Sequence, residues 1–245
     1  MGIDSIARHA PHSALFFIGW ILYILGIETS TKVCGAAIVD DGTWIAHNQT
    51  NLKNIHASIL VDLVQAAFHQ TSISATDLTA IGVSIGPGSF TGLRIGLSVA
   101  KGLALGANVP IVTVPTLDAL AHHAPVRDGI VAAVLKSRAD EYYYAQYKRH
   151  NFRNELVLAP HILKTTELID ALPADSLLIG HTAEFQNHAA LRDKIQCAPE
   201  GSAAPSASSV ALLGRQKYIA GDLAEYETVE PMYFQDFIAG KPKAL

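Results

Sequence analysis

The sequence predicts an α/β protein, and two observations carry this prediction. Apolar runs of strand length alternate with segments of helical period along the first half of the chain, and the second half repeats this order with shorter elements. Apolar residues make up 49% of the 245 residues and charged residues 16%, where about 25% charge is usual for a soluble domain. Such a chain can bury a large core, and its length leaves one large domain or two small ones open.

The first half predicts a three-stranded antiparallel meander, then a helix, a strand, a second helix and a further strand. Asp40, Asp41 and Gly42 form the turn between the second and third strands. The fourth strand is almost entirely apolar, which is typical of a sheet covered on both faces. The expected strands are residues 21–27, 35–39, 43–50, 80–85 and 110–114, and the expected helices are residues 54–71 and 91–105.

The second half predicts a thinner version of the same arrangement. Residues 202–209 are rich in Ser, Ala and Pro and are expected to form a loop, and Gly221 ends the helix that follows it. The expected strands are residues 130–135, 141–148 and 177–179, the first two pairing with each other, and the expected helices are residues 166–171 and 210–220.

The charge and the cysteine content exclude several classes of function. A formal net charge of −4 gives no long-range attraction for nucleic acid, so any RNA contact must be local or shared with a partner. Cys34 and Cys197 lie far apart and outside any CxxC or CxH spacing, so neither a zinc site nor a disulfide framework is indicated. Reduced thiols in a cytoplasmic protein are therefore expected.

The N-terminus contains an uncharged apolar run over residues 14–27, which is too short to span a bilayer as a helix. Residues 1–19 are interpreted as an N-terminal extension before the first strand, and no membrane association is expected. A signal peptide remains an alternative because Arg8 precedes the apolar run, although no small-residue cleavage site follows it.

The segment SIGPGSFTGLR (residues 84–94) joins an expected strand to an expected helix. Gly86, Gly88, Ser89 and Gly92 could present backbone N–H groups to a phosphate at the helix N-terminus. The spacing matches neither GxxxxGK[ST] nor GxGxxG, and the alternative is a tight connection in which Ser89 caps the helix. A nucleophilic role for Ser89 is not indicated, because a nucleophile elbow requires GxSxG.

The sequence predicts no catalytic residue and no metal site. A metal site on a helix usually needs a second ligand one turn away, and His56 is followed there by Leu60. The basic residues Lys148, Arg149 and Arg153 lie beside tyrosines and are the candidates for an RNA contact. The alternative is a strand whose tyrosines pack on one face before a solvated turn. These tyrosines are Tyr142, Tyr143, Tyr144 and Tyr147.

The helix expected over residues 91–105 is apolar almost all round, so it must be buried almost all round. One sheet covers only one side of it. Gly92, Gly96 and Ala100 lie at i, i+4 and i+8, which would let a second helix come close. The sequence therefore predicts a partner-binding surface that also supports a homodimer of the isolated chain. Its residues are His56, Ile59, Leu63, Leu93, Gly96, Leu97, Ala100 and Lys101.

Two stretches, ILGIETSTKVCGAAIVDDG and GVSIGPGSFTGLRIGLSVAKGLALG, closely resemble the bacterial TsaB (YeaZ) family. The resemblance is strong over residues 21–120 and weak beyond them. It implies the actin-like, sugar-kinase-like superfold with two RNase H-like α/β domains, the second of them reduced. We therefore expect an extension over residues 1–19, a partner-binding first domain over residues 20–117, and a smaller second domain over residues 118–245 whose C-terminal helix packs back on the first.

The resemblance also implies a function. The family partners TsaD and the ATPase TsaE in making threonylcarbamoyladenosine at position 37 of ANN-decoding tRNAs, and supports catalysis without performing it. We therefore expect a non-catalytic subunit that heterodimerises with a TsaD-like protein and recruits a TsaE-like ATPase. tRNA and ATP or ADP are expected only at the level of the complex, with no cofactor on this chain alone. The alternative is a nucleotide-dependent, kinase-like enzyme or a glycoprotease-like peptidase of the same superfold.

Three sites depart from the pattern of the family. Glu28 stands where an aspartate is usual, and its longer side chain would hold a phosphate-bound metal in a different register. Lys136 and Ser137 replace the first two residues of the family's DAR, of which only Arg138 is kept, and residues 231–235 read PMYFQ in place of P-x-Y-x-R. The change at Glu28 argues against nucleotide binding at this position.

Overall fold

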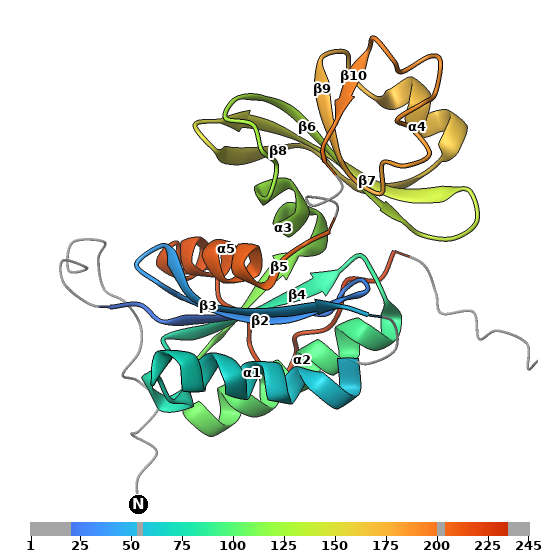
Figure 1. Cartoon of the computed structure of the whole chain (residues 1–245). Helices are drawn as coiled ribbons and strands as arrows, with labels where there is room; N and C mark the ends of the chain where they lie inside the picture. The colour runs from blue at the N-terminus through green and yellow to red at the C-terminus, as the bar shows by residue number, and fades with distance from the viewer. Residues whose placement is uncertain (1–20, 53–55, 200–203, 235–245) are drawn as a thin grey trace, which may run out of the picture.

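The computed structural model describes residues 21–52, 56–199 and 204–234, which form a mixed α/β fold (Figure 1). Within these residues the strands make two five-stranded sheets. Each sheet, with the helices packed on it, is called a domain below. The extension predicted over residues 1–19 lies outside the described residues.

The first sheet is built from strands predicted in the first half of the chain. They are β1 (Ile24–Glu28), β2 (Val33–Asp40), β3 (Thr43–Asn51), β4 (Ala80–Gly86) and β5 (Ile111–Pro115). Their order is β3-β2-β1-β4-β5, in which β1 pairs antiparallel with β2 and parallel with β4. Helices α1 (His56–Thr71) and α2 (Phe90–Ala107) cover one face, and α5 (Ala207–Ile219) covers the other (Figure 1). A short 3₁₀ helix, Ala75–Asp77, precedes β4.

Helix α5 comes from the C-terminal part of the chain and packs closely on the first sheet. A Cβ atom on Gly26 of β1 would overlap the backbone of Ala207 and Ala211. Gly214 of α5 lies in turn against the backbone of Gly82 on β4. Glycines on both sides therefore bring the helix and sheet backbones together.

The second sheet comprises β6 (Gly129–Lys136), β7 (Glu141–His150), β8 (Arg153–Lys164), β9 (Ser176–Gly180) and β10 (Ile195–Cys197). Their order is β10-β9-β6-β7-β8. The predicted pairing of the first two strands is confirmed, because β6 and β7 form an antiparallel ladder. Helix α4 (Thr165–Ala171) packs against β7 and β8.

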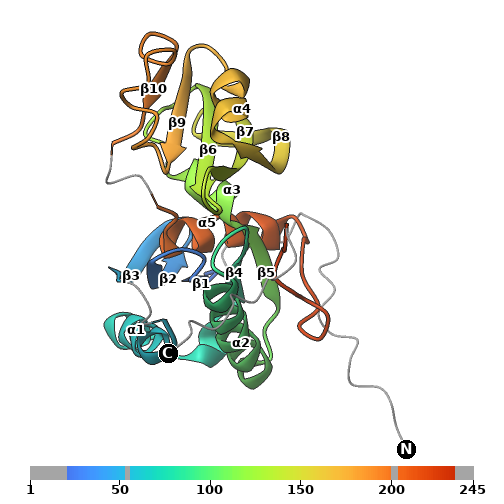
Figure 2. The same ribbon diagram turned by 90° about the vertical axis from the view of Figure 1, so that its right-hand side faces the viewer.

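Helix α3 (Thr116–His122) follows β5 of the first sheet and precedes β6 of the second, so it joins the two domains (Figure 2). Its Asp118 Oδ1 accepts a hydrogen bond from the hydroxyl of Tyr147 on β7, 2.6 Å away. Arg149, also on β7, donates to the carbonyl oxygen of Ala121 at the C-terminal end of α3, 2.9 Å away. A positive charge at this end is favoured by the helix dipole. These contacts fix α3 to the second sheet.

The sequence does not predict four of these elements, which are α3, β8, β10 and the short 3₁₀ helix Ala75–Asp77. Helix α3 has 7 residues and β10 has 3, too few to establish a period. Strand β8 is exposed along much of its length, so its residues do not alternate between apolar and polar. The last helix begins at Ala207, ahead of the predicted residue 210, because the hydroxyl of Ser206 caps it.

Candidate functional site

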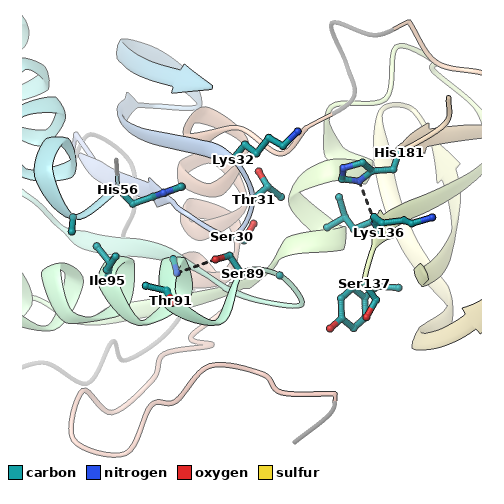
Figure 3. A pocket seen from close by; sticks show the side chains of 15 residues that line it. Ser30, Thr31, Lys32, His56, Ser89, Thr91, Ile95, Lys136, Ser137 and His181 are labelled. Atoms are coloured by element: carbon teal, nitrogen blue, oxygen red, sulfur yellow. Dashed lines mark hydrogen bonds between the residues drawn. The ribbon is translucent and has the colours of Figure 1, made fainter. Parts of the chain in front are cut away.

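A cleft of about 570 Å³ lies between the two domains, beside the loop that joins β4 to α2 (Figure 3). The β1–β2 turn and the first turns of α1 and α2 form one wall, and residues at the ends of β6 and β9 and near the start of β7 form the other. The polar lining residues are Ser30, Thr31, Lys32, His56, Ser89 and Thr91 on the first domain, and Lys136, Ser137, Tyr143 and His181 on the second.

The candidate phosphate loop at Gly86, Gly88, Ser89 and Gly92 has two of its backbone donors occupied. The backbone N–H of Ser89 donates to the carbonyl oxygen of Ser30, 2.6 Å away, and that of Gly92 donates to Ser89 Oγ, 3.2 Å away. Ser89 is the N-cap residue of α2, which confirms the alternative interpretation of this residue. A Cβ atom on Gly88 would overlap the carbonyl oxygen of Ser30. Close packing of the loop on the β1–β2 turn therefore explains Gly88.

Glu28 is buried at the C-terminal end of β1. Its Oε1 accepts hydrogen bonds from the backbone N–H and the hydroxyl of Ser30, at 2.6 and 2.5 Å. Burial raises the pKa of this carboxyl from its ordinary 4.5 to about 7, although the Ser30 hydrogen bonds lower it. Its Oε2 has no hydrogen-bond partner among the described residues. The described residues that line the cleft include no aspartate or glutamate. These residues do not fit a magnesium-bound nucleotide, because magnesium in such sites is usually held by one or two carboxylates, and no described lining residue supplies one.

His56 is predicted on the partner surface, but the structure buries it to 8% exposure. Its Nε2 lies 3.0 Å from the carbonyl oxygen of Val33, so the ring ties the start of α1 to the start of β2. Across the described part of the chain, no three His, Cys, Asp or Glu side chains gather in a group that could hold a metal ion.

Helix α2 carries an inner ridge of small residues, Gly92, Gly96 and Ala100, all of which are buried. A Cβ atom on Gly96 would overlap Oγ1 of Thr29, and one on Gly92 would overlap the carbonyl oxygen of the same residue. This corrects the prediction that the ridge faces a partner, because it packs on the end of β1 in its own domain. Leu93 and Leu97 are also buried, whereas Ile59, Leu63 and Lys101 are partly exposed.

An outer ridge of small residues, Ser98, Gly102 and Gly106, is exposed on the opposite side of α2. A Cβ atom on either glycine would meet nothing within 4 Å. Leu105 beside the ridge is 65% exposed, and Val61 of α1 is 49% exposed. A groove of about 450 Å³ between α1 and α2 is lined by Ala57, Phe90, Thr91, Arg94, Ile95, Ser98 and Val99. The outer ridge, this groove, Leu105 and Val61 together are called the outer face.

At one end of the groove, residues from two distant parts of the chain form a cluster. The guanidinium of Arg94 lies 3.8 Å from the ring centroid of Phe90, and its Nε donates to the hydroxyl of Tyr233, 2.9 Å away. The C-terminal segment reaches this point because the N–H of Met232 donates to the carbonyl oxygen of Ile85, 2.7 Å away. The sequence signal for this cluster is Arg94, a charged residue in a helix that is otherwise almost entirely apolar. Nothing in the sequence places residue 233 beside it.

The basic stretch that is a candidate for an RNA contact is partly used in the packing of the fold. Arg149 is 4% exposed and caps α3, so it is not free for a ligand, which corrects that candidate. Three of the four tyrosines are buried, namely Tyr142, Tyr144 and Tyr147, as the packing alternative predicts. Lys148 and Arg153 are exposed, and they stay candidates for a contact with tRNA. Of the helices in the described residues, none is both long and apolar enough to cross a membrane.

Two mixed sheets with a cleft between them define an actin-like α/β protein, and solved structures support this class. YeaZ from Pseudomonas aeruginosa has a TM-score of 0.76 at 25% identity and covers 86% of this chain and 99% of that one. The activator of the 2-hydroxyisocaproyl-CoA dehydratase from Clostridium difficile, solved with bound ADPNP, has a TM-score of 0.51 and covers 86% of this chain and 100% of that one. At 8% identity, this second likeness shows the fold alone.

Sequence comparisons identify the family. A family model described as TsaD, tRNA N6-adenosine threonylcarbamoyltransferase, matches residues 50–240. The tRNA threonylcarbamoyladenosine biosynthesis protein TsaB of Escherichia coli K12 is 31% identical over 226 residues, which are 89% of this chain and 96% of that protein. TsaB of Bacillus subtilis is 29% identical, over 80% of this chain and 89% of that protein. This chain belongs to the TsaB (YeaZ) family of tRNA threonylcarbamoyladenosine biosynthesis proteins.

Proposed function

We propose that this chain is a non-catalytic scaffold subunit for threonylcarbamoyl transfer to adenosine 37 of ANN-decoding tRNAs. It heterodimerises with a TsaD-like transferase through the outer face, and the pair recruits a TsaE-like ATPase. The complex, and not this chain alone, binds tRNA and uses ATP in the cytoplasm. Family membership supports this role, and the observation that carries it is the exposed apolar outer face.

The outer face has the features of a protein interface. Leu105 is 65% exposed, and removing its apolar surface from water is favourable by about 25 cal/mol per Å², before the costs of association are subtracted. Gly102 and Gly106 leave open space above α2, so the backbone of a partner helix can approach closely. Arg94 and Tyr233 are of residue types that are enriched at interface hot spots. A partner helix laid along the groove would cover all of these groups.

Two contacts inside the first domain support a non-catalytic role. The carboxyl of Glu28 is turned to Ser30, and the imidazole of His56 is hydrogen-bonded to the backbone of Val33. Side chains that could otherwise bind a metal or transfer a proton at the cleft are therefore used in packing.

Reconstitution of tRNA modification tests the proposed role directly. The purified chain with tRNA and threonylcarbamoyl-adenylate should form no threonylcarbamoyladenosine. Adding the TsaD-like and TsaE-like proteins with ATP should produce it, and omitting this chain from that mixture should abolish it. Modification by this chain without the TsaD-like protein would contradict the proposal and favour the enzyme alternative.

A matched pair of variants tests the outer face. Val61→Glu places a charge on α1 at a side chain that is 49% exposed, and Ile219→Glu places the same charge on α5 at one that is 46% exposed. Burying an unpaired carboxylate costs several kcal/mol, so Val61→Glu should weaken binding to the TsaD-like protein roughly 100-fold. Ile219→Glu lies across the sheet and should leave the affinity unchanged. Equal affinities of two folded variants would exclude the outer face as the interface.

The same face should make the isolated chain self-associate at high concentration, because a contiguous apolar patch is rarely left uncovered. Sedimentation equilibrium should then show a homodimer for the wild type and for Ile219→Glu, and a monomer for Val61→Glu. A Val61→Glu dimer of unchanged affinity would place the homodimer contact elsewhere.

A further inference from the structure

We propose that the cleft between the two domains binds a small oxyanion, bearing phosphate or carboxylate groups, through side-chain donors and without a divalent metal. The donors are Lys32, Ser89 and Thr91 of the first domain, and Ser137 and His181 of the second. This site is separate from the outer face, so the inference does not depend on the identity of the protein partner.

Lys32 supplies a positive charge to the cleft that has no ion-pair partner among the described residues. Its side chain extends from the β1–β2 turn toward His181 of the opposite domain (Figure 3) and forms no ion pair with a described residue. Lys136 also lines the cleft, but its ammonium lies 2.9 Å from Glu184 Oε1 and 2.9 Å from the hydroxyl of Tyr142. Lys136 is therefore paired within the protein, whereas Lys32 has no ion-pair partner in the described part of the chain.

His181 supplies a neutral hydrogen-bond donor on the second wall. Its Nδ1 accepts a hydrogen bond from the backbone N–H of Lys136, 3.2 Å away, so the ring proton lies on Nε2. Burial lowers the pKa of His181, and the charges of Lys32 and Lys136 lower it further against the opposing effect of Glu184. The imidazole is therefore neutral at pH 7 and donates one hydrogen bond from Nε2.

The rest of the lining suits an anion and does not suit a metal. No carboxylate is among the described lining residues, and Glu28 behind them is bonded to Ser30. Among the described lining residues, an anion therefore meets no carboxylate, and magnesium finds no carboxylate ligand. Ser89 Oγ accepts from the N–H of Gly92, which leaves its own hydrogen for a ligand.

The volume of the cleft restricts the ligand to a small molecule. About 570 Å³ lies within the roughly 300–1,000 Å³ that small-molecule sites occupy. Lys32 and His181 belong to opposite walls, so an anion with several acceptor oxygens can contact both domains at once. Pyrophosphate and citrate are suitable probes, because they share this property and differ in their oxyanion groups.

Isothermal titration of the full chain with pyrophosphate and with citrate, each with and without magnesium, tests the site. At least one probe should bind without magnesium. Lys32→Gln should weaken its binding roughly 10- to 100-fold, and His181→Phe about 10-fold. The control Lys148→Gln removes an equal charge from an exposed position on β7 and should leave binding unchanged. The probe should also raise the melting temperature of the wild type more than that of Lys32→Gln.

Three results would overturn the proposal: no binding of either probe at about 10 mM, an equal loss in Lys32→Gln and Lys148→Gln, or binding that requires magnesium. Binding of pyrophosphate alone would assign a phosphate ligand, and binding of citrate alone would assign a carboxylate ligand. Because no partner protein is present in these titrations, their failure leaves the proposed scaffold role untouched, and loss of that role leaves this site untouched.

Discussion

The two ends of α2 hold the same residue type for opposite structural reasons. In its first turns, Gly92 and Gly96 lie so close to Thr29 that neither position has room for a Cβ atom. In its last turns, Gly102 and Gly106 face open space within 4 Å. Gly92 and Gly96 let the first turns of α2 pack directly on the end of β1, and this part of the helix is called the pinned end. Gly102 and Gly106 leave space beside the last turns, which are called the open end.

This difference shows what a period in the sequence can and cannot establish. Both pairs have a spacing of four residues, so each forms a ridge along the helix axis. The spacing does not say which ridge faces the sheet, because that depends on where the β1–β2 turn meets the helix. The prediction selects the inner ridge for the partner, and the structure leaves the outer ridge available.

Gly92→Ala should produce the largest effect on the pinned end. Alanine would gain about 1 kcal/mol of helix propensity, but its Cβ would overlap the carbonyl oxygen of Thr29, which is backbone and cannot turn aside. We expect a net loss of roughly 3 kcal/mol and a melting temperature lower by roughly 5 to 10 °C. An unchanged melting temperature would mean that α2 is not pinned and can move outward.

The pinned end also contains Glu28, whose pKa is about 7 in the folded protein against an ordinary 4.5. Between these values the folded state binds more protons than the unfolded state, so the free energy of unfolding falls as the pH rises. Glu28→Gln keeps an acceptor for Ser30 and cannot ionise. It should match the wild type near pH 5 and exceed it by on the order of 2 kcal/mol at pH 8.

Urea unfolding of both proteins at several pH values measures this difference. A constant offset between pH 5 and pH 8 would show that Glu28 is not the group that titrates.

Ser89→Ala should have a smaller effect at the same end. It removes the oxygen that accepts the Gly92 N–H at 3.2 Å, and loss of such an N-cap costs about 1 kcal/mol. Ser89→Asn keeps an N-cap acceptor and should recover most of this loss, which thermal melts of the three proteins can measure. Equal melting temperatures for all three proteins would show that the Ser89 cap does not stabilise the fold.

Much of the first domain is predictable because its signals are local. Apolar runs, the turn at Asp41 and Gly42, and the helical period of α1 and α2 each depend on neighbouring residues, and their elements appear within a few residues of the expected bounds. The cap at Ser89 is predictable for the same reason, since the residue and its acceptor role lie within one turn.

The site is less predictable because its contacts join distant segments. Tyr233 reaches Arg94 across 139 positions, and Arg149 reaches the end of α3 across 28. From the sequence, an isolated basic residue is a candidate to bind a ligand. In the structure, however, the guanidinium of Arg149 donates hydrogen bonds to backbone carbonyls, whereas Lys32 lines the cleft without an ion-pair partner among the described residues. Tertiary packing decides between these outcomes.

Gly102→Ala should have the smallest effect, and it acts at the open end of α2. Its Cβ would meet nothing within 4 Å, so the fold gains helix propensity without a clash. We expect a gain of up to about 1 kcal/mol and a melting temperature higher by roughly 2 to 4 °C in the isolated chain. A partner helix packed closely on the outer ridge would meet the added methyl group, so affinity for the TsaD-like protein should fall while stability rises. Gly221→Ala cannot serve as the control for this variant, because φ at Gly221 is +76° and an alanine there would be strained. If stability and affinity rise together, the partner does not pack on the outer ridge, and the contact lies nearer to Val61 and the groove.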